Sequence, residues 1–324
     1  MARGWTSLLR LGVGPLALLL GGCITVNLGA NGRGELEKTV VHGENGPEIL
    51  LLDVSGVISA ERQGGTFGIG ERESLLARVR EQLDRGAEED VRALVLRIDS
   101  PGGTVTASEI LYGEIARFKE ETGIPVVAAF LGTAASGAYY AAMAADTLVA
   151  YPTSVIGSIG VIFSGVNVSG LMEKIGVEDQ TLTTGAFKDA GSPLRPMRPE
   201  ERAELQGVLD QLHRRFVDVV VAGRPNLDAD RVAALADGRI WSAPQALELG
   251  LVDAVDDLPG AIAEAERRAG LTESRVVVYH RPGAYRANLY STPPAPAPLA
   301  LDPRALLGPV REPAFLYLWW PGVR

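Results

Sequence analysis

Cysteine, histidine and lysine are scarce in this chain of 324 residues, which has one cysteine, three histidines and four lysines. A single cysteine, Cys23, allows no disulfide within the chain. Zinc-ligand spacings and the HExxH pattern of metallopeptidases are absent from the sequence. The formal net charge of −9, with no cluster of lysine or arginine, argues against a nucleic-acid partner. With 46% hydrophobic and 22% charged residues, the composition is that of an ordinary globular protein.

The first 23 residues resemble the export signal of a bacterial lipoprotein. Two arginines accompany an apolar run over 11–20, which is too short for a comfortable membrane span. The run ends in Leu-Gly-Gly-Cys, which resembles a lipobox, so we expect Cys23 to be lipidated and to begin the mature chain. The alternative is an uncleaved N-terminal anchor. Both interpretations attach the protein to a membrane of the bacterial cell envelope, with its body outside the cytoplasm.

Composition divides the rest of the chain into three parts. Residues 24–47 are polar and glycine-rich and are interpreted as a linker. Residues 48–280 alternate apolar runs with amphipathic segments and are expected to form one domain. Residues 281–324 are rich in proline and are interpreted as an extended tail. The apolar end of this tail predicts that it docks on a neighbouring copy or enters the substrate groove.

The first half of the domain predicts an α/β fold. Apolar runs indicate buried strands, and apolar residues at helical spacing indicate helices between them. The strands are expected over 49–54, 91–99 and 125–130, and the helices over 71–85, where Gly86 would end the helix, and from Thr106 or Ser108 to 119. This alternation predicts a largely parallel sheet flanked by helices.

The second half continues in the same way but with shorter segments. Helices are expected over 171–175, 199–222, 228–236, 243–249 and 258–269. Strands are expected over 146–150, 178–184, 239–241 and 276–279, and a loop over 185–196.

One hydroxyl stands out at the end of the third strand. The segment 132–142, GTAASGAYYAA, places Ser136 among small residues where a strand gives way to a helix. An exposed hydroxyl at a helix N-terminus, where negative charge is favoured, suits a nucleophile. The alternative is a plain tight turn in which Ser136 caps the helix.

A nucleophilic serine needs a base. His42, His213 and His280 lie in the expected linker, on a helix surface and at the edge of the tail, so none has a convincing setting. A lysine can act as the base where burial in an apolar site lowers its pKa. Lys188 lies in the loop between a strand and the long helix, unlike the other three lysines, and is either this base or a solvated loop residue.

Five motifs appear in the order seen in signal peptide peptidase A-type serine peptidases: RIDSPGG, GTAASGAYYAA, TSVIGSIGV, GAFKDAGSP and WSAPQALELGLV. The similarity spans roughly residues 49–270 and implies a crotonase/Clp-protease-like single domain without a cofactor. It implies that Ser136 is the nucleophile and Lys188 the base. The spacing resembles that of the short members of the family, so both groups are expected to come from one domain.

The resemblance also implies the supporting residues. Gly103 and the backbone N–H of Ser136 match the family's oxyanion hole, and Ser158 matches the hydroxyl that orients the lysine. Asp99 and Asp189 are conceivable triad acids, but we expect Asp99 to be structural, at the end of a strand.

The expected activity is hydrolysis of extended, apolar peptides, such as signal-peptide remnants, by a homo-oligomeric ring. Small residues around Ser136 predict small or apolar groups at the cleaved bond. Two other functions are compatible with the sequence. A crotonase-type acyl-CoA enzyme has the same architecture, and a non-catalytic envelope scaffold could use the same anchor and tail.

Overall fold

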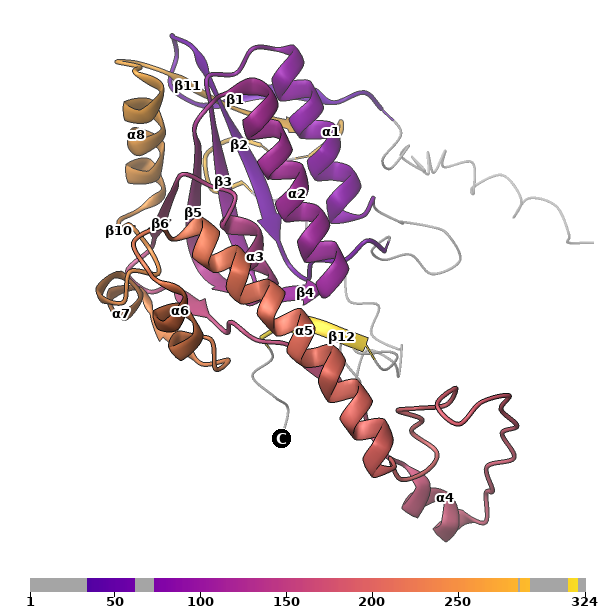
Figure 1. Cartoon of the computed structure of the whole chain (residues 1–324). Helices are drawn as coiled ribbons and strands as arrows, with labels where there is room; N and C mark the ends of the chain where they lie inside the picture. Colours follow the sequence, from indigo (N-terminus) through magenta and orange to yellow (C-terminus); the bar gives the residue numbers. More distant parts are fainter. Residues whose placement is uncertain (1–33, 62–72, 285, 292–313, 320–324) are drawn as a thin grey trace, which may run out of the picture.

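The computed structural model describes residues 34–61, 73–284, 286–291 and 314–319. The predicted signal segment and Cys23 lie outside these ranges. Figure 1 shows a central sheet with α1, α2 and α3 on one side and α8 on the other. In the part of the chain that the structure describes, no helix is both long enough and apolar enough to cross a membrane.

The main sheet has nine strands among the described residues. Its order is β1 (Glu37–His42), β11 (Arg275–His280), β2 (Glu48–Ser55), β3 (Ala93–Ser100), β5 (Val126–Ala135), β6 (Thr147–Ala150) and β10 (Ala254–Val255). β7 (Val155–Gly157) pairs with the end of β5, and β9 (Ile240–Ser242) pairs with β7. Every pair is parallel except β1 with β11 and β7 with β9, so the predicted largely parallel α/β sheet is confirmed.

Both faces of the sheet are covered, which explains its continuous apolar runs. Leu50 and Leu52 of β2 belong to the apolar core beneath α1 (Leu75–Glu88), α2 (Val105–Thr122) and α3 (Gly137–Ala142). Ile49 and Leu51, which alternate with them, belong to the core beneath α8 (Leu258–Ala269). Successive side chains of a strand point to opposite faces, so a strand between two helical layers must be apolar throughout.

A smaller, three-stranded sheet lies beside the carboxyl ends of β3 and β5. It consists of β4 (Gly102–Thr104), β12 (Ala314–Leu318) and β8 (Ile162–Ser164), with β12 in the middle and antiparallel to both neighbours. The remaining helices are α4 (Ser169–Ile175), α5 (Pro199–Gly223), α6 (Ala229–Leu235) and α7 (Ala243–Glu248).

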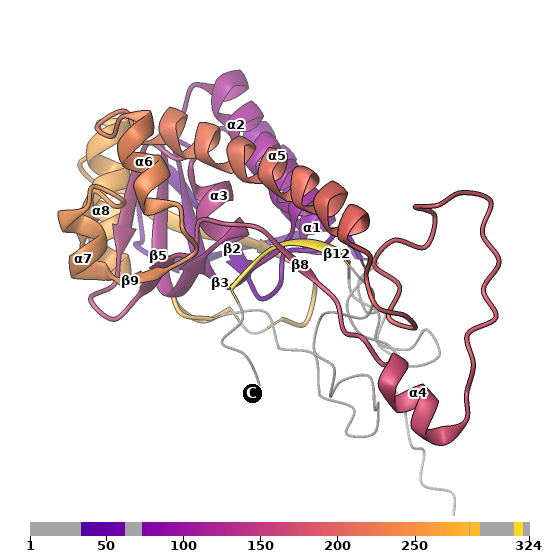
Figure 2. The same ribbon diagram turned by 60° about the horizontal axis from the view of Figure 1, so that its bottom comes forward.

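Residues 165–198, here called the arm, extend away from the sheet. Figure 2 shows α4 and the following loop apart from the body, at the outer end of α5. All side chains from Glu173 to Lys188 are exposed, and large apolar residues are among them. Ile175 and Leu182 expose 64% and 97% of their surface. An apolar surface of this kind indicates an interaction site.

Three sequence predictions are wrong. Gly86 does not end α1, which continues to Glu88, because a glycine at this position packs closely against β2. Residues 178–184 form no strand; they belong to the exposed arm and have no neighbouring strand to pair with. The linker predicted over 24–47 contains β1, which pairs with β11, so the domain begins before residue 48.

The tail predicted over 281–324 is partly attached to the body. The Arg97 guanidinium is buried and donates hydrogen bonds to the carbonyl oxygens of Leu289 and Ser291. It also pairs with the Asp53 carboxylate, at 2.5 Å. Further on, β12 pairs with β4 and β8, so this part of the predicted tail is a strand of the smaller sheet.

Candidate active site

Ser136 lies at a sharp turn between a strand and a helix. β5 ends at Ala135 and α3 begins at Gly137, while Ser136 itself has φ 53° and ψ −119°. A positive φ is unfavourable for a residue with a side chain and persists only where the surroundings impose it. The side chain makes no capping hydrogen bond, so the alternative role of a simple helix cap is not supported. A strained turn of this type also places the serine hydroxyl of α/β-hydrolases at the end of a strand.

The hydroxyl of Ser136 is fully buried, whereas the sequence predicted an exposed one. Its Oγ has no hydrogen-bond partner among the described residues. Strand β12 lies at this end of the sheet, next to α3 and β4. A buried hydroxyl without a partner is costly, and its retention points to a chemical role.

Two other predicted site residues lie next to Ser136. The backbone N–H of Ser136 donates to the carbonyl of Gly157 at 2.7 Å. Ser158 is the residue after Gly157 and therefore lies close to Ser136. Ser158 also has a positive φ of 51°, and its N–H is bound by the carbonyl of Arg239 at 2.7 Å. Gly103 lies in β4, which contacts α3. The structure therefore brings Gly103, Ser136 and Ser158 together.

The predicted oxyanion hole needs a correction. The N–H of Ser136 is already bound to the Gly157 carbonyl and is not free to stabilise an oxyanion. Gly137 is the first residue of α3, and N–H groups in a first helical turn have no acceptor within the helix. The N–H of Gly137 is thus the better-placed donor beside Gly103. The sequence contained a signal for this, since the glycine after Ser136 has no side chain that would cover its N–H.

Lys188 lies in the arm, and the structure does not join it to Ser136. Its side chain is exposed, and the unpartnered Ser136 Oγ excludes a hydrogen bond between the two. The loop around Lys188 is attached to the start of α5 instead. Arg195 binds Asp189 at 2.7 Å and Glu201 at 2.5 Å. The dyad is therefore not assembled within the described single chain.

Ion pairs where the arm joins α5 hold the loop around Lys188 in place. Hydrogen bonds from Arg195 lower the pKa of Asp189 and, together with those from Arg198, hold the pKa of Glu201 at about 2. Asp189 is thus an ion-pair partner of Arg195, not a neighbour of the serine. On the other side of the loop, Gly191 packs against the ring of Phe163 in β8. The loop that carries Lys188 therefore touches the edge of the smaller sheet.

The remaining polar candidates have structural contacts. The carboxylate of Asp99 accepts the N–H of Thr133 at 2.9 Å, which confirms that it serves the strand ends. His213 binds the carbonyl of Ala236 at 2.7 Å, and His280 lies 2.9 Å from the hydroxyl of Thr39. None of these side chains contacts the hydroxyl of Ser136.

An aromatic cluster adjoins the site and was missed in the sequence. Tyr317 of β12 is fully buried against Tyr140 of α3 and Phe216 of α5, with ring centroids 5.2 Å and 4.7 Å away. The phenol of Tyr140 donates to the Glu109 carboxylate, which Arg215 also binds. Burial and this hydrogen bond raise the pKa of Tyr140. The adjacent tyrosines after Ser136 were the only sequence signal for this cluster.

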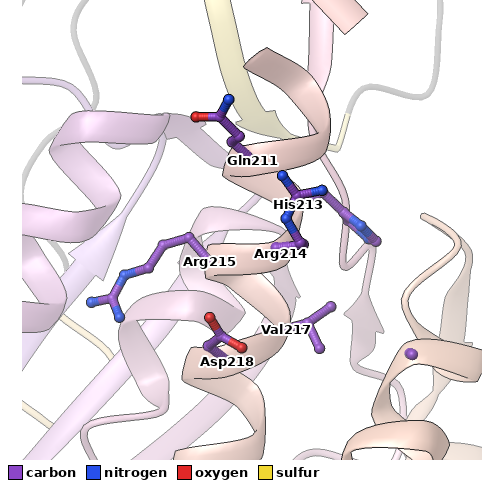
Figure 3. Close-up of a pocket in the computed structure, with 7 residues that line it drawn as sticks. Gln211, His213, Arg214, Arg215, Val217 and Asp218 are labelled. Carbon is purple, nitrogen blue, oxygen red and sulfur yellow. The ribbon is translucent and has the colours of Figure 1, made fainter. Parts of the chain in front are cut away.

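A separate hollow of about 490 Å³ lies between α5 and α6. It is lined by Gln211, His213, Arg214, Arg215, Val217 and Asp218 of α5 and by Ala233 of α6, and Figure 3 shows the side chains of α5. None of the predicted site residues lines it. Among the residues that the structure describes, no group of three histidine, cysteine or acidic side chains is arranged to hold a metal ion.

Comparison with known proteins identifies the family. Residues 118–272 match the model of peptidase family S49. A protein of Enterococcus faecium named as a signal peptide peptidase is 37% identical over 245 residues, which are 75% of this chain and 70% of that protein. A protein of Synechocystis named as a protease is 40% identical over 71% of this chain and 77% of its own length.

A longer relative covers the same region. Protease 4 of Salmonella typhi is 31% identical over 238 residues, which are 73% of this chain but 37% of that protein. The parallel sheet flanked by helices agrees with the Clp-protease and crotonase type of fold found in family S49. The fold, the strained serine and these similarities lead to one conclusion: the chain belongs to peptidase family S49, as a peptidase similar to the signal peptide peptidase A type.

Proposed function

We propose that this peptidase is a serine endopeptidase that uses Ser136 and Lys188 to hydrolyse extended, apolar peptides, such as signal-peptide remnants, at the membrane. The observation that carries the proposal is the buried, unpartnered hydroxyl of Ser136 on a strained turn. The strained backbone and the unsatisfied hydroxyl both destabilise the fold. Nucleophilic attack is a role that explains why a serine is kept at this position.

The mechanism follows from these groups. Lys188, in its neutral form, takes the proton from the Ser136 hydroxyl while the oxygen attacks the carbonyl carbon of the peptide bond. The N–H groups of Gly103 and Gly137 stabilise the negative charge on the carbonyl oxygen. The lysine then gives its proton to the leaving amine. Water, deprotonated by Lys188, then attacks the acyl carbon, the bond from this carbon to the Ser136 oxygen breaks, and Lys188 returns the proton to that oxygen. Ser158 orients the lysine throughout.

Labelling with a fluorophosphonate tests the nucleophile. The wild type should be labelled at Ser136, and Ser136→Ala should lose both the label and peptide hydrolysis. Ser154 is a matched control, since it is equally buried but its hydroxyl donates to the carbonyl of Phe130 at 2.7 Å. Ser154→Ala should keep the label. A wild type that is folded, hydrolyses no peptide and takes up no label would refute the proposal and favour the scaffold alternative.

Lys188 is tested against another lysine of the arm. Lys188→Ala should abolish hydrolysis, whereas Lys174→Ala, which removes an exposed lysine from α4, should not. Full activity in Lys188→Ala would refute the dyad. The membership in a peptidase family speaks against the crotonase-type acyl-CoA alternative.

Homo-oligomerisation is part of the proposal, and the arm is the expected contact surface. Its exposed apolar residues would be covered by a second copy, which would hold Lys188 against a serine of its own or of the neighbouring chain. Mixing Ser136→Ala with Lys188→Ala distinguishes these cases. If the neighbour supplies the lysine, the mixture should regain activity at about a quarter of its sites. If one chain supplies both groups, the mixture should stay inactive.

A further inference from the structure

The turn that carries Ser158 is held from two sides. On one side, the carbonyl of Gly157 accepts the N–H of Ser136 at 2.7 Å. On the other side, the N–H of Ser158 donates to the carbonyl of Arg239, also at 2.7 Å. Strand β7, which ends at Gly157, pairs with the end of β5 and with β9. The turn is therefore fixed between the strand that leads to the nucleophile and β9.

Both serines of the site have a strained backbone. Ser136 has φ 53° and Ser158 has φ 51°, and they are two of the three non-glycine residues with positive φ in the part of the chain that the structure describes. Such a conformation destabilises a residue with a side chain and persists only where its surroundings impose it. A hydrogen bond joins Ser136 to the residue before Ser158, so a contact that holds one strained position also supports the other.

The side chain of Trp241 packs directly on this turn. Trp241 is the central residue of β9, pairs with Ile156 and is only 9% exposed. Its indole ring covers Gly157, because a Cβ atom at Gly157 would lie 2.5 Å from the nearest ring carbon. Gly157 has φ 106°, a conformation that glycine adopts readily. A smaller side chain in place of Trp241 would leave a space into which the turn could relax.

We infer that Trp241 is a positioning residue of the peptidase, whose ring holds the turn at Gly157 and thereby keeps the Ser158 hydroxyl and the Ser136 backbone in the reactive arrangement. The inference rests on the proposed function, in which Ser158 orients the lysine. Because Trp241 is buried behind the turn, its effect is on the chemical step and not on the binding of substrate. A displacement of about 1 Å in a catalytic group can lower the rate about 100-fold, so even a small relaxation of the turn is measurable.

Kinetics of full-length variants on one internally quenched peptide of leucine and alanine test the inference. Trp241→Leu should lower kcat at least about tenfold and change KM less than about twofold, because only the positions of the reacting groups are altered. Trp241→Phe, which keeps a flat ring over Gly157, should recover most of this loss. Phe118→Leu is the matched control, because Phe118 is a buried aromatic residue of α2, and it should leave kcat nearly unchanged. Equal kcat values for Trp241→Leu and Phe118→Leu would overturn the inference.

Double variants show whether Trp241 acts through Ser158. Ser158→Ala should lower kcat by the same factor in the wild type and in Phe118→Leu. In Trp241→Leu, where the hydroxyl is already displaced, the same substitution should have a much smaller effect. A residue that only stabilises the fold would give losses that multiply. Multiplied losses in the Ser158→Ala, Trp241→Leu double variant, or full activity in Ser158→Ala, would therefore overturn the inference.

Thermal unfolding separates this inference from the proposed function, because it needs no hydrolysis. Ser136→Gly should melt at a higher temperature than Ser136→Ala, since glycine relieves the positive φ. In the Trp241→Leu background this difference should disappear, whereas in Phe118→Leu it should remain. If it disappears while no variant hydrolyses the peptide, the role of Trp241 is supported and the proposed function fails alone. A difference that is unchanged in Trp241→Leu, or absent in the wild type, overturns the inference alone, even if the wild type is an active peptidase.

Discussion

Replacing Ser136 should make the protein more stable, and two substitutions of increasing effect test this. Ser136→Ala removes a buried hydroxyl without a hydrogen-bond partner, a group that costs about 1–3 kcal/mol, so the free energy of unfolding should rise by about 1 kcal/mol. Ser136→Gly also relieves the positive φ, which costs a residue with a side chain about 1–3 kcal/mol. Glycine offsets about 0.5–1 kcal/mol of this gain, because it increases the conformational entropy of the unfolded chain. The net second step is therefore about 1 kcal/mol.

Urea unfolding of the wild type and the two variants measures both steps, provided the slope with urea is unchanged. At about 2–4 °C per kcal/mol for a domain of this size, the melting temperature of Ser136→Gly should rise by about 4–8 °C. Asp90→Gly is the control, because Asp90 has φ 52° in an exposed turn far from any proposed chemistry. Its gain should be smaller, since aspartate tolerates this conformation. A Ser136→Gly variant less stable than Ser136→Ala would refute the strain argument.

Three further predictions concern the remainder of the chain. The pKa of Glu201 is lowered to about 2 from its ordinary 4.5, so its ionised form stabilises the fold above pH 4.5, and this stabilisation is lost as the pH falls towards 2. Glu201→Gln should thus have a lower free energy of unfolding than the wild type at pH 7, and this difference should shrink below pH 4.5. Urea unfolding at several pH values measures both. Arg97→Met removes the ion pair with the mostly buried Asp53 and should cost about 3 kcal/mol in the same assay, whereas an unchanged stability would contradict the role of Arg97. Cys23→Ala should abolish incorporation of labelled palmitate, and undiminished labelling would exclude lipidation at this residue.

The parallel strands and the helices that cover them were predictable from sequence because burial on both faces leaves a direct pattern. The runs that became β2, β3 and β5 contain almost only apolar residues. Gly123 caps the end of α2, but the N-cap is Thr104 and not Thr106 or Ser108 as predicted. The turn at Ser136 was predictable for a related reason, since only small residues fit between the end of β5 and α3.

Long-range contacts could not be predicted in this way. β1 lies in a polar, glycine-rich stretch, and only its pairing with β11, more than two hundred residues away, makes it a strand. β12 follows a proline-rich segment and is buried through contacts with α3 and α5. The residues next to β12 in the sequence do not indicate which elements it contacts. Residues 178–184 show the opposite case, since a strand-like composition forms no strand without a neighbour. Likewise, the motif around Lys188 indicates a role but not a position.

The central place of β12 in the smaller sheet defines what any other segment would need in order to take its position. A segment that pairs with β4 and β8 simultaneously must offer unpaired N–H and C=O groups on both of its sides. A helical peptide or a hairpin uses those groups internally and must first give them up. Under the proposed function, turnover is therefore expected to depend on the supply of unstructured chain, so that short peptides are degraded quickly while folded proteins are spared.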